Sequence, residues 1–164
     1  EGREGGTGAA PLEFTNAVGM PLKDGLSFVS SELRVAGLRD DIKVLAAGKS
    51  LTGFDMIRNF ALGADVINSA RGMMLALGCI QALRCDSNHC PVGITTNNPG
   101  LVKGLNVEWK SQRVANYHGE TVKVVKSLLS AMGKTGPENV SRSDVYQRQS
   151  DGTYRTYSEI YGPV

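Results

Sequence analysis

The three cysteines of this chain are its clearest chemical feature, because all three lie within one stretch of twelve residues. The stretch runs from Cys79 through Cys85 to Cys90, which gives the spacing C-x5-C-x4-C. Three thiolates on one turn and loop form the donor set that a soft metal ion or an iron–sulfur cluster requires. A cysteine can also be a small core residue, and Cys79 in its apolar run fits that alternative. Core packing explains the other two poorly, since they lie in a polar loop, and we expect a metal or cluster site.

The two histidines offer a weaker case for metal binding. His89 adjoins Cys90 and would complete a zinc site beside three thiolates, but neighbouring residues seldom both point at one metal. His118 lies within a helical pattern, where a packing or surface role is expected. No nucleophile–base pair and no pair of carboxylates stands out, so the catalytic residues stay unassigned.

The cysteines must be positioned by surrounding elements, and the apolar pattern predicts a succession of helices and short strands. Helical spacing of apolar residues predicts helices over 21–35, 54–62, 71–83 and 107–132, and a short one in the polar tail over 143–148. Continuous apolar runs predict buried strands over 42–47 and 64–69. This alternation indicates an α/β fold with a parallel sheet. Two strands leave both sheet edges open, so we expect the C-terminal part of something larger, unable to fold cooperatively alone.

Two loops follow the two predicted strands and meet at one edge of the sheet, where α/β proteins bind ligands. They contain Gly48 and Lys49 after the first strand, and Ser69, Ala70, Arg71 and Gly72 after the second. A helix start offers free N–H groups to an anion, and an arginine adds a bidentate contact. A glycine after a strand is more often a plain turn, and a lone arginine is more often solvated. The pairing of both loops favours a phosphate site, although neither loop matches the Walker or dinucleotide fingerprint.

Composition excludes several classes of function. The chain has 164 residues with a net charge of +2, so electrostatics favour neither nucleic acid nor a membrane surface as a partner. No apolar run approaches the roughly 18 residues of a membrane span, and no signal peptide is visible. An odd number of bunched cysteines argues against a disulfide framework and for a reducing compartment. We therefore expect a cytoplasmic protein.

A series of motifs resembles the FMN-binding synthase domain of glutamate synthase, and most of all the shorter proteins of the FMN-binding glutamate synthase family. The motifs are EGGTGAAP at 4–11, GLRD at 37–40, AGKSLTG at 47–53, LGAD at 62–65 and the cysteine stretch with its flanks at 77–93. The match is collinear to about residue 97 and looser through the long helix. The larger enzymes of the family usually carry Asp where this chain has Glu4.

The resemblance implies a fold and two cofactors. The fold is the C-terminal portion of a TIM (β/α)8 barrel with a C-terminal helical extension: residues 1–97 would be its last βα units, and residues 98–164 a helix and polar tail packed on the barrel. FMN would bind at Gly5, Gly6, Thr7 and Gly8, with its phosphate on the two loops named above. A [3Fe–4S] cluster would be ligated by Cys79, Cys85 and Cys90. About 12 Å of helix, from Arg71 to Cys79, would connect phosphate and cluster.

The resemblance also implies a reaction: 2-iminoglutarate, formed from 2-oxoglutarate and ammonia, is reduced to L-glutamate with electrons passed through the cluster and FMN. The expected partners are the remainder of the barrel and an electron-donor protein or domain. Two alternatives stay open. One is a related FMN and iron–sulfur oxidoreductase acting on another substrate, and the other is a small structural metal-binding module.

Overall fold

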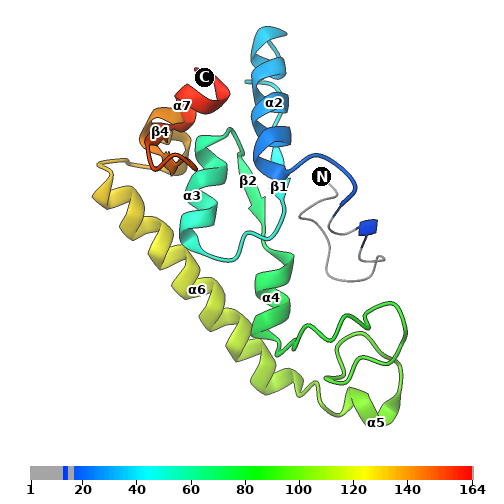
Figure 1. The fold of residues 1–164 in the computed structure, drawn as a ribbon. Coiled ribbons are helices and arrows are strands. Elements are labelled where there is room, and N and C mark those ends of the chain that lie inside the picture. The colour runs from blue at the N-terminus through cyan, green and yellow to red at the C-terminus, as the bar shows by residue number, and fades with distance from the viewer. Residues whose placement is uncertain (1–12, 15–16, 164) are drawn as a thin grey trace.

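Helices and strands alternate in the first part of the chain and give way to a long helix and a short tail (Figure 1). The structure, a computed structural model, describes residues 13–14 and 17–163. Its first part contains α2 (Leu22–Val35), β1 (Leu45–Ala47), α3 (Gly53–Ala61), β2 (Val66–Asn68) and α4 (Ala70–Ala76). Its second part contains α5 (Pro99–Val102), α6 (Val107–Ala131), the 3-10 turns η1 (Pro137–Asn139) and η2 (Arg142–Asp144), β3 (Tyr146–Arg148), β4 (Tyr154–Thr156) and α7 (Tyr157–Tyr161). This order confirms the α/β class, the two parallel strands and the predicted helices over 21–35, 54–62 and 107–132.

The β1–β2 sheet is covered on one face only by the described residues. The strands are parallel, with Leu45 opposite Val66 and Ala46 opposite Ile67. Ala46 belongs to the hydrophobic core and Ile67 packs against it, whereas Leu45 and Val66 on the other face are 60% and 46% exposed. Strands of parallel sheets are normally buried on both faces. Within the described residues, one apolar face of this sheet is therefore left exposed.

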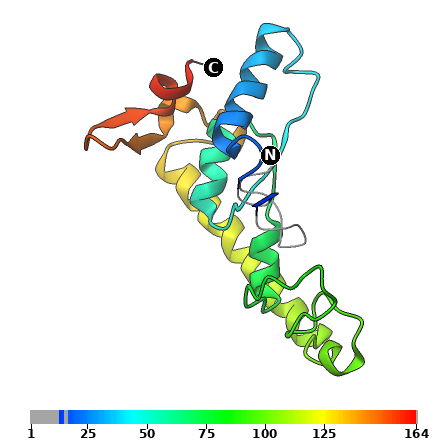
Figure 2. The same ribbon diagram turned by 45° about the vertical axis from the view of Figure 1, so that its right-hand side comes forward.

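The long helix α6 supports the strand–helix units from one side. Both views show that it runs diagonally along α3 and α4 (Figures 1 and 2). Its Leu129 joins a core that also includes residues of α2, α3 and the tail, among them Leu26, Ile57, Val140 and Tyr157. Although α6 has 25 residues, no helix in the described part of the chain is both long and apolar enough to cross a lipid bilayer.

The tail returns to α2 through one buried arginine. The guanidinium of Arg142 donates hydrogen bonds to the carbonyls of Tyr161 at 2.9 Å, Gly162 at 3.1 Å and Ser27 at 3.0 Å. Arg142 is only 1% exposed, and a buried charge is tolerated when several acceptors replace its water shell. This Arg142 clasp, formed by the guanidinium and its three carbonyls, fixes the end of the tail against α2.

The predicted tail helix over 143–148 is wrong. Only η2 is helical there, and β3 pairs with β4 in an antiparallel hairpin that projects from the body of the molecule (Figure 2). Its turn is closed by a hydrogen bond from Gln149 N to Thr153 O at 2.8 Å, and Gly152 adopts a φ of 85°. A glycine reaches this left-handed conformation without strain, so the chain reverses here and residues 146–148 pair with residues 154–156 instead of continuing η2 as a helix.

Candidate functional site

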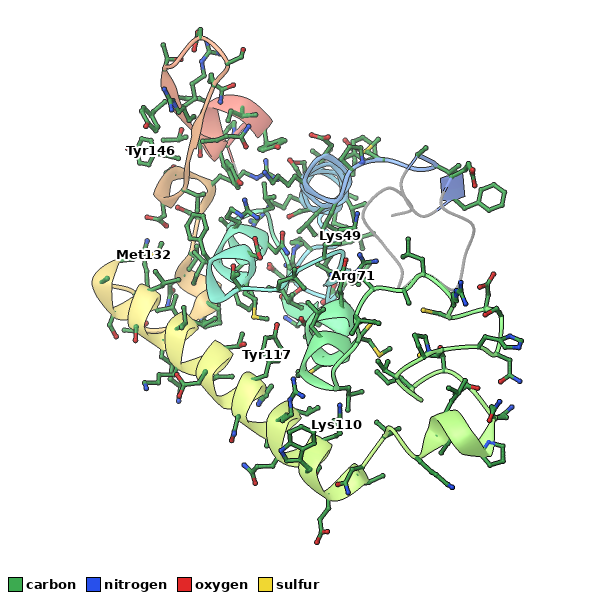
Figure 3. The ribbon with its side chains drawn as sticks, turned by 60° about the horizontal axis from the view of Figure 1, so that its bottom comes forward. Lys49, Arg71, Lys110, Tyr117, Met132 and Tyr146 are labelled. Atoms are coloured by element: carbon green, nitrogen blue, oxygen red, sulfur yellow. The ribbon has the colours of Figure 1, made fainter. Side chains whose placement is uncertain are left out.

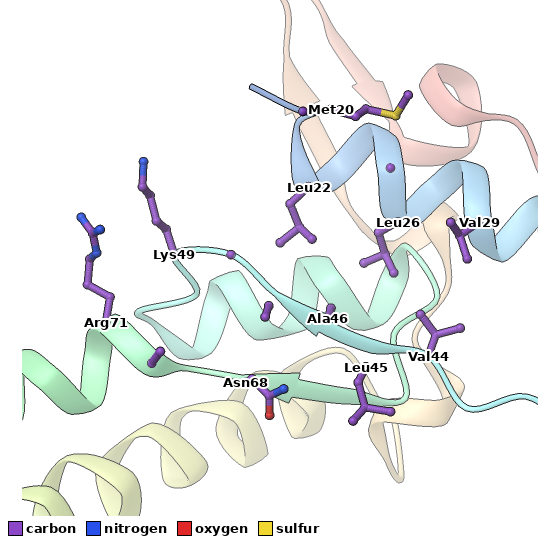
Figure 4. A pocket seen from close by; sticks show the side chains of 15 residues that line it. Met20, Leu22, Leu26, Val29, Val44, Leu45, Ala46, Lys49, Asn68 and Arg71 are labelled. Atoms are coloured by element: carbon purple, nitrogen blue, oxygen red, sulfur yellow. The ribbon is translucent and has the colours of Figure 1, made fainter. Parts of the chain in front are cut away.

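The predicted phosphate loops do lie together at the carboxyl edge of the sheet. Because β1 and β2 are parallel and in register to their last residues, the chain leaves both strands at the same level. Residues 48–52 follow β1, and Ser69 with the first turn of α4 (residues 70–72) follows β2; we call these two segments the sheet-edge loops. Lys49 and Arg71 project from the two loops in the same direction, as the close-up in Figure 4 shows. A cavity of about 610 Å³ lies against them, with apolar walls from α2 and β1 and the polar groups Lys49, Arg71 and Asn68 at its rim.

The first sheet-edge loop holds a conformation that its sequence alone does not favour. Lys49 has a φ of 42°, in the left-handed region that a non-glycine residue seldom adopts. The carboxylate of Asp55 supports the loop by accepting hydrogen bonds from Leu51 N at 3.2 Å and Thr52 N at 2.9 Å. Burial acts to raise the pKa of Asp55, but these hydrogen bonds and the adjacent Arg58 outweigh it and lower the pKa. Strain held in place by surrounding contacts is typical of binding loops.

A polar network beneath both loops was not anticipated from the sequence. Asn59 Nδ2, from α3, donates to the buried Ser50 Oγ at 2.8 Å. Ser69 Oγ, from the second loop, donates to Ser50 O at 2.5 Å and so joins the two loops directly. Asn59 is a buried residue of the amphipathic helix α3, and a buried amide requires a hydrogen-bond partner. An asparagine in this helix was therefore the one sign in the sequence that polar partners lie beneath the loops.

Helix α4 is shorter than predicted, which corrects the helix expected over 71–83. It ends at Ala76 with Leu77 as its C-cap, and Gly78 has a φ of 97°. The Nζ of Lys110, from α6, donates to Leu77 O at 2.7 Å and satisfies the exposed carbonyl end of the helix. Cys79 therefore lies beyond the helix, and the expected 12 Å of continuous helix from Arg71 to Cys79 is wrong. With seven residues in α4, the charges of Lys49 and Arg71 matter more at the sheet edge than a helix dipole.

The cysteines lie in residues 77–98, a stretch without helix or strand between α4 and α5 (Figure 1) that we call the cysteine segment. Cys79 and Cys85 line a small cavity of about 20 Å³ together with Arg71 and Met74. Cys90 is buried, and all three thiols are free of disulfide bonds. Within the described residues, no three His, Cys, Asp or Glu side chains converge closely enough to hold a metal ion. His89 directs its ring to the carbonyl of Ser87, with Nδ1 2.6 Å from the oxygen.

The chemistry of the cysteines nevertheless fits a soft metal or cluster. Burial acts to raise the pKa of the Cys90 thiol, but hydrogen bonds from the backbone N–H groups of Thr95, Val92 and Ile94 outweigh it and lower the pKa to about 7. Such N–H groups stabilise a thiolate, which is the form that binds metal. Cys79 and Cys85 already face a common space. Ligation by all three would require the cysteine segment to close further around the bound group.

One predicted cofactor loop cannot be compared with the structure. Gly5, Gly6, Thr7 and Gly8 lie outside the described residues. The other six predicted binding residues, Gly48, Lys49, Ser69, Ala70, Arg71 and Gly72, belong to the sheet-edge loops, and Gly48, Lys49, Ala70 and Arg71 line the large cavity directly.

Comparison with known proteins gives one consistent family. Residues 1–135 match the family model described as the conserved region in glutamate synthase. The chain is 42% identical over 153 residues to the glutamate synthase large subunit-like protein YerD of Bacillus subtilis. The aligned region makes up 93% of this chain and 29% of that protein. It is 39% identical over 140 residues to the archaeal glutamate synthase [NADPH] of Methanocaldococcus jannaschii, covering 85% and 28% of the two chains.

A larger relative matches the same part of the chain. The glutamate synthase [NADPH] large chain of Bacillus subtilis is 34% identical over 145 residues, which is 88% of this chain and 9% of that protein. The chain thus spans less than a third of the length of each of these three relatives.

Proposed function

Because this chain belongs to the glutamate synthase family, we propose that it forms the part of a flavin-dependent oxidoreductase that holds the phosphate of FMN and ligates an iron–sulfur cluster. In this proposal the chain is the C-terminal portion of a (β/α)8 barrel, and the sheet-edge loops belong to its last two βα units. Residues 98–164 form an extension that packs against those units.

The arrangement of Lys49 and Arg71 carries the phosphate assignment. Both side chains project from neighbouring strand ends toward one side of a cavity of about 610 Å³ (Figure 4). Two cations at the rim of an apolar cavity suit a ligand with a flat aromatic body and a dianionic end. An arginine matches a phosphate with a planar fork, and a lysine adds a compact charge. FMN has this shape and this charge distribution.

The cluster assignment rests on the donor set. Cys79, Cys85 and Cys90 are free thiols on one segment, and a depressed pKa favours the thiolate of Cys90. Three thiolates suit a [3Fe–4S] cluster, which differs from the four-cysteine clusters in its ligand count. Lys110 holds the residue two positions before Cys79, so the segment starts from a fixed point.

We assign these residues to the reduction of 2-iminoglutarate, formed from 2-oxoglutarate and ammonia, to L-glutamate. When bound, the cluster would supply electrons and FMN would supply hydride. The chain's own residues would hold the cofactor phosphate, position the thiolates and line the apolar cavity.

Two partners follow from the same proposal. The exposed face of Leu45 and Val66 fits the remaining strands of the barrel, whether they belong to the same polypeptide or to another subunit. An electron-donor protein or domain must reduce the cluster. Three free thiols on one segment are consistent with the reducing cytoplasm as the site of action.

The decisive experiment uses the full-length protein that contains this chain. We expect the purified protein to contain both FMN and cluster iron, and to form L-glutamate from 2-oxoglutarate when ammonia or glutamine and a reductant are added. Both cofactors without turnover of 2-oxoglutarate would favour a related oxidoreductase with another substrate. Zinc in place of iron and flavin would favour a structural metal module and contradict the proposal.

A further inference from the structure

Tyr117 lies at a position in α6 from which it reaches both sheet-edge loops (Figure 3). Its Oη donates a hydrogen bond to Leu51 O at 2.6 Å, in the loop that follows β1. The same oxygen lies 3.5 Å from Ser69 Oγ, in the loop that follows β2. One phenol hydroxyl from a distant helix therefore touches both loops that carry the cationic side chains.

The contact completes a set of hydrogen bonds that joins helices α3 and α6 to both loops. Asn59 Nδ2 donates to Ser50 Oγ, and Ser69 Oγ donates to Ser50 O. Tyr117 Oη donates to the next carbonyl along the chain, that of Leu51. Without the phenol, a part-buried carbonyl would lose its partner, which costs more than an exposed hydrogen bond.

Gly72 shows that the backbone is adapted to this tyrosine. A Cβ built at position 72 would lie 2.0 Å from Tyr117 Oη and 2.6 Å from Ser69 Oγ. No real side chain tolerates such distances, so the hydroxyl occupies the space that any other residue at position 72 would fill. Gly72 lies within the first turn of α4 and is not forced into a left-handed conformation. The need for glycine here comes from the phenol.

We propose that Tyr117 is a positioning residue for the flavin phosphate. By holding Leu51 and lying against Ser69, it fixes the separation of the two loops and therefore the separation of Lys49 and Arg71. Two cations bind one phosphate tightly only when their spacing is set before the ligand arrives. This inference rests on the proposed binding of FMN by the sheet-edge loops, and it assigns a new role to a residue that does not touch the ligand.

Riboflavin, which lacks the phosphate, provides the test. In the full-length protein freed of flavin, the dissociation constants of FMN and riboflavin are measured by quenching of flavin fluorescence. The Tyr117→Phe variant is expected to bind FMN about tenfold more weakly, because a part-buried carbonyl loses its partner and the loops lose their spacing. Its affinity for riboflavin is expected to change less than about twofold, since the apolar cavity is unaltered.

Two further variants make the result specific. Tyr146→Phe removes a hydroxyl from an exposed tyrosine in β3 and is expected to leave both affinities unchanged. Asn59→Ala removes the amide that donates to Ser50 Oγ beneath the loops and is expected to reproduce the selective loss of FMN affinity, so it tests the same network should Tyr117→Phe fold poorly.

The outcomes separate the inference from the function on which it rests. If the unaltered protein binds riboflavin as tightly as FMN, the phosphate assignment itself fails. If the unaltered protein prefers FMN, and Tyr117→Phe keeps the full preference or weakens both ligands equally, the positioning role is overturned while the phosphate assignment stands.

Discussion

The sheet-edge loops and the cysteine segment are neighbours in the chain, yet they are supported in different ways. The sheet-edge loops receive hydrogen bonds from α3 through Asn59 and from α6 through Tyr117. In the cysteine segment, many of the hydrogen bonds are internal, such as Thr96 Oγ1 to Asn88 O at 2.6 Å and Asn97 N to Asn88 Oδ1 at 2.7 Å. The first region is organised by the protein before any ligand binds. The start of the second region is held by Lys110, and Cys79 and Cys85 line a small cavity, an arrangement that fits the proposed cluster site.

The largest expected effect is on the cluster itself. Replacing Cys85 with Ser removes one of three soft ligands, so we expect the full-length protein to lose most of its bound iron while retaining much of its FMN. Iron analysis and visible absorbance measure the two cofactors separately. His89→Ala is the matched control, because the imidazole contacts Ser87 O. Iron retained in Cys85→Ser, or lost in His89→Ala, would contradict the assignment of ligands.

The packing of α6 under the sheet-edge region predicts the next effect. A Cβ at Gly53 would lie 2.6 Å from Val124 Cγ1, so Gly53→Ala should lower the free energy of unfolding by about 2 kcal/mol through overpacking. Gly119→Ala is the control on α6, where a Cβ would meet nothing within 4 Å. That variant should be more stable by about 0.5 kcal/mol, since alanine favours a helix. Equal melting temperatures in the two variants would mean that α6 does not pack as described.

Lys110 connects the two regions, and its removal should loosen the cysteine segment. Lys110→Met leaves the Leu77 carbonyl without its charged donor, which we expect to cost about 1.5 kcal/mol and to speed the loss of iron in air. Melting curves and the rate of iron release are the measurements. Lys123→Met, an exposed lysine on the same helix, is expected to change neither. If iron release in Lys110→Met matches that of the unaltered protein, the segment does not depend on this hydrogen bond.

The smallest effect depends on pH. Asp65 accepts hydrogen bonds from Val44 N at 2.7 Å and pairs with Arg39 at 2.9 Å. Burial acts to raise its pKa, but these partners outweigh burial and lower it from 3.8. A lowered pKa in the folded state means that the carboxylate stabilises the fold above pH 3.8 and loses this contribution as the pH falls through the lowered value.

Asp65→Asn is therefore expected to be less stable by about 1 kcal/mol at pH 7, with the difference shrinking below pH 3.8. Chemical unfolding at a series of pH values measures it. The exposed Asp24 in the first turn of α2 provides the control as Asp24→Asn. A difference that grows in acid would show that the sign assigned to Asp65 is wrong.

The sequence predicted the elements whose apolar pattern is interrupted by clear stops. α2 ends before Gly37 and α3 before Gly63, where glycines with positive φ follow the last turn. The helix α4 was predicted too long because its apolar pattern continues to Leu83. What ends it is Gly78 together with Lys110, which lies 33 residues beyond Leu77, and a contact over that separation leaves no mark in the local pattern.

The site was predicted in part for a similar reason. Lys49 and Arg71 could be placed together because parallel strands end at one edge, a rule that needs no knowledge of packing. In the sequence, Tyr117 is only one of the apolar positions of a long helix. Its hydroxyl contacts Leu51, which lies 66 residues away, so the local pattern could not predict this contact. The β3–β4 hairpin was missed although Asp151-Gly152 is a known turn pair, because the flanking residues are mostly polar and carry little strand signal.

The Arg142 clasp constrains the order in which the chain can fold during synthesis. Arg142 joins Ser27 across 115 residues, and its other two acceptors, Tyr161 and Gly162, are made later still. Synthesis proceeds from the N-terminus at about 5–20 residues per second, so α2 leaves the ribosome several seconds before Arg142 and the carbonyls of Tyr161 and Gly162 are made. During that interval its apolar face is available to chaperones and proteases, and Tyr161 and Gly162 complete the docking of a helix that was made well before them.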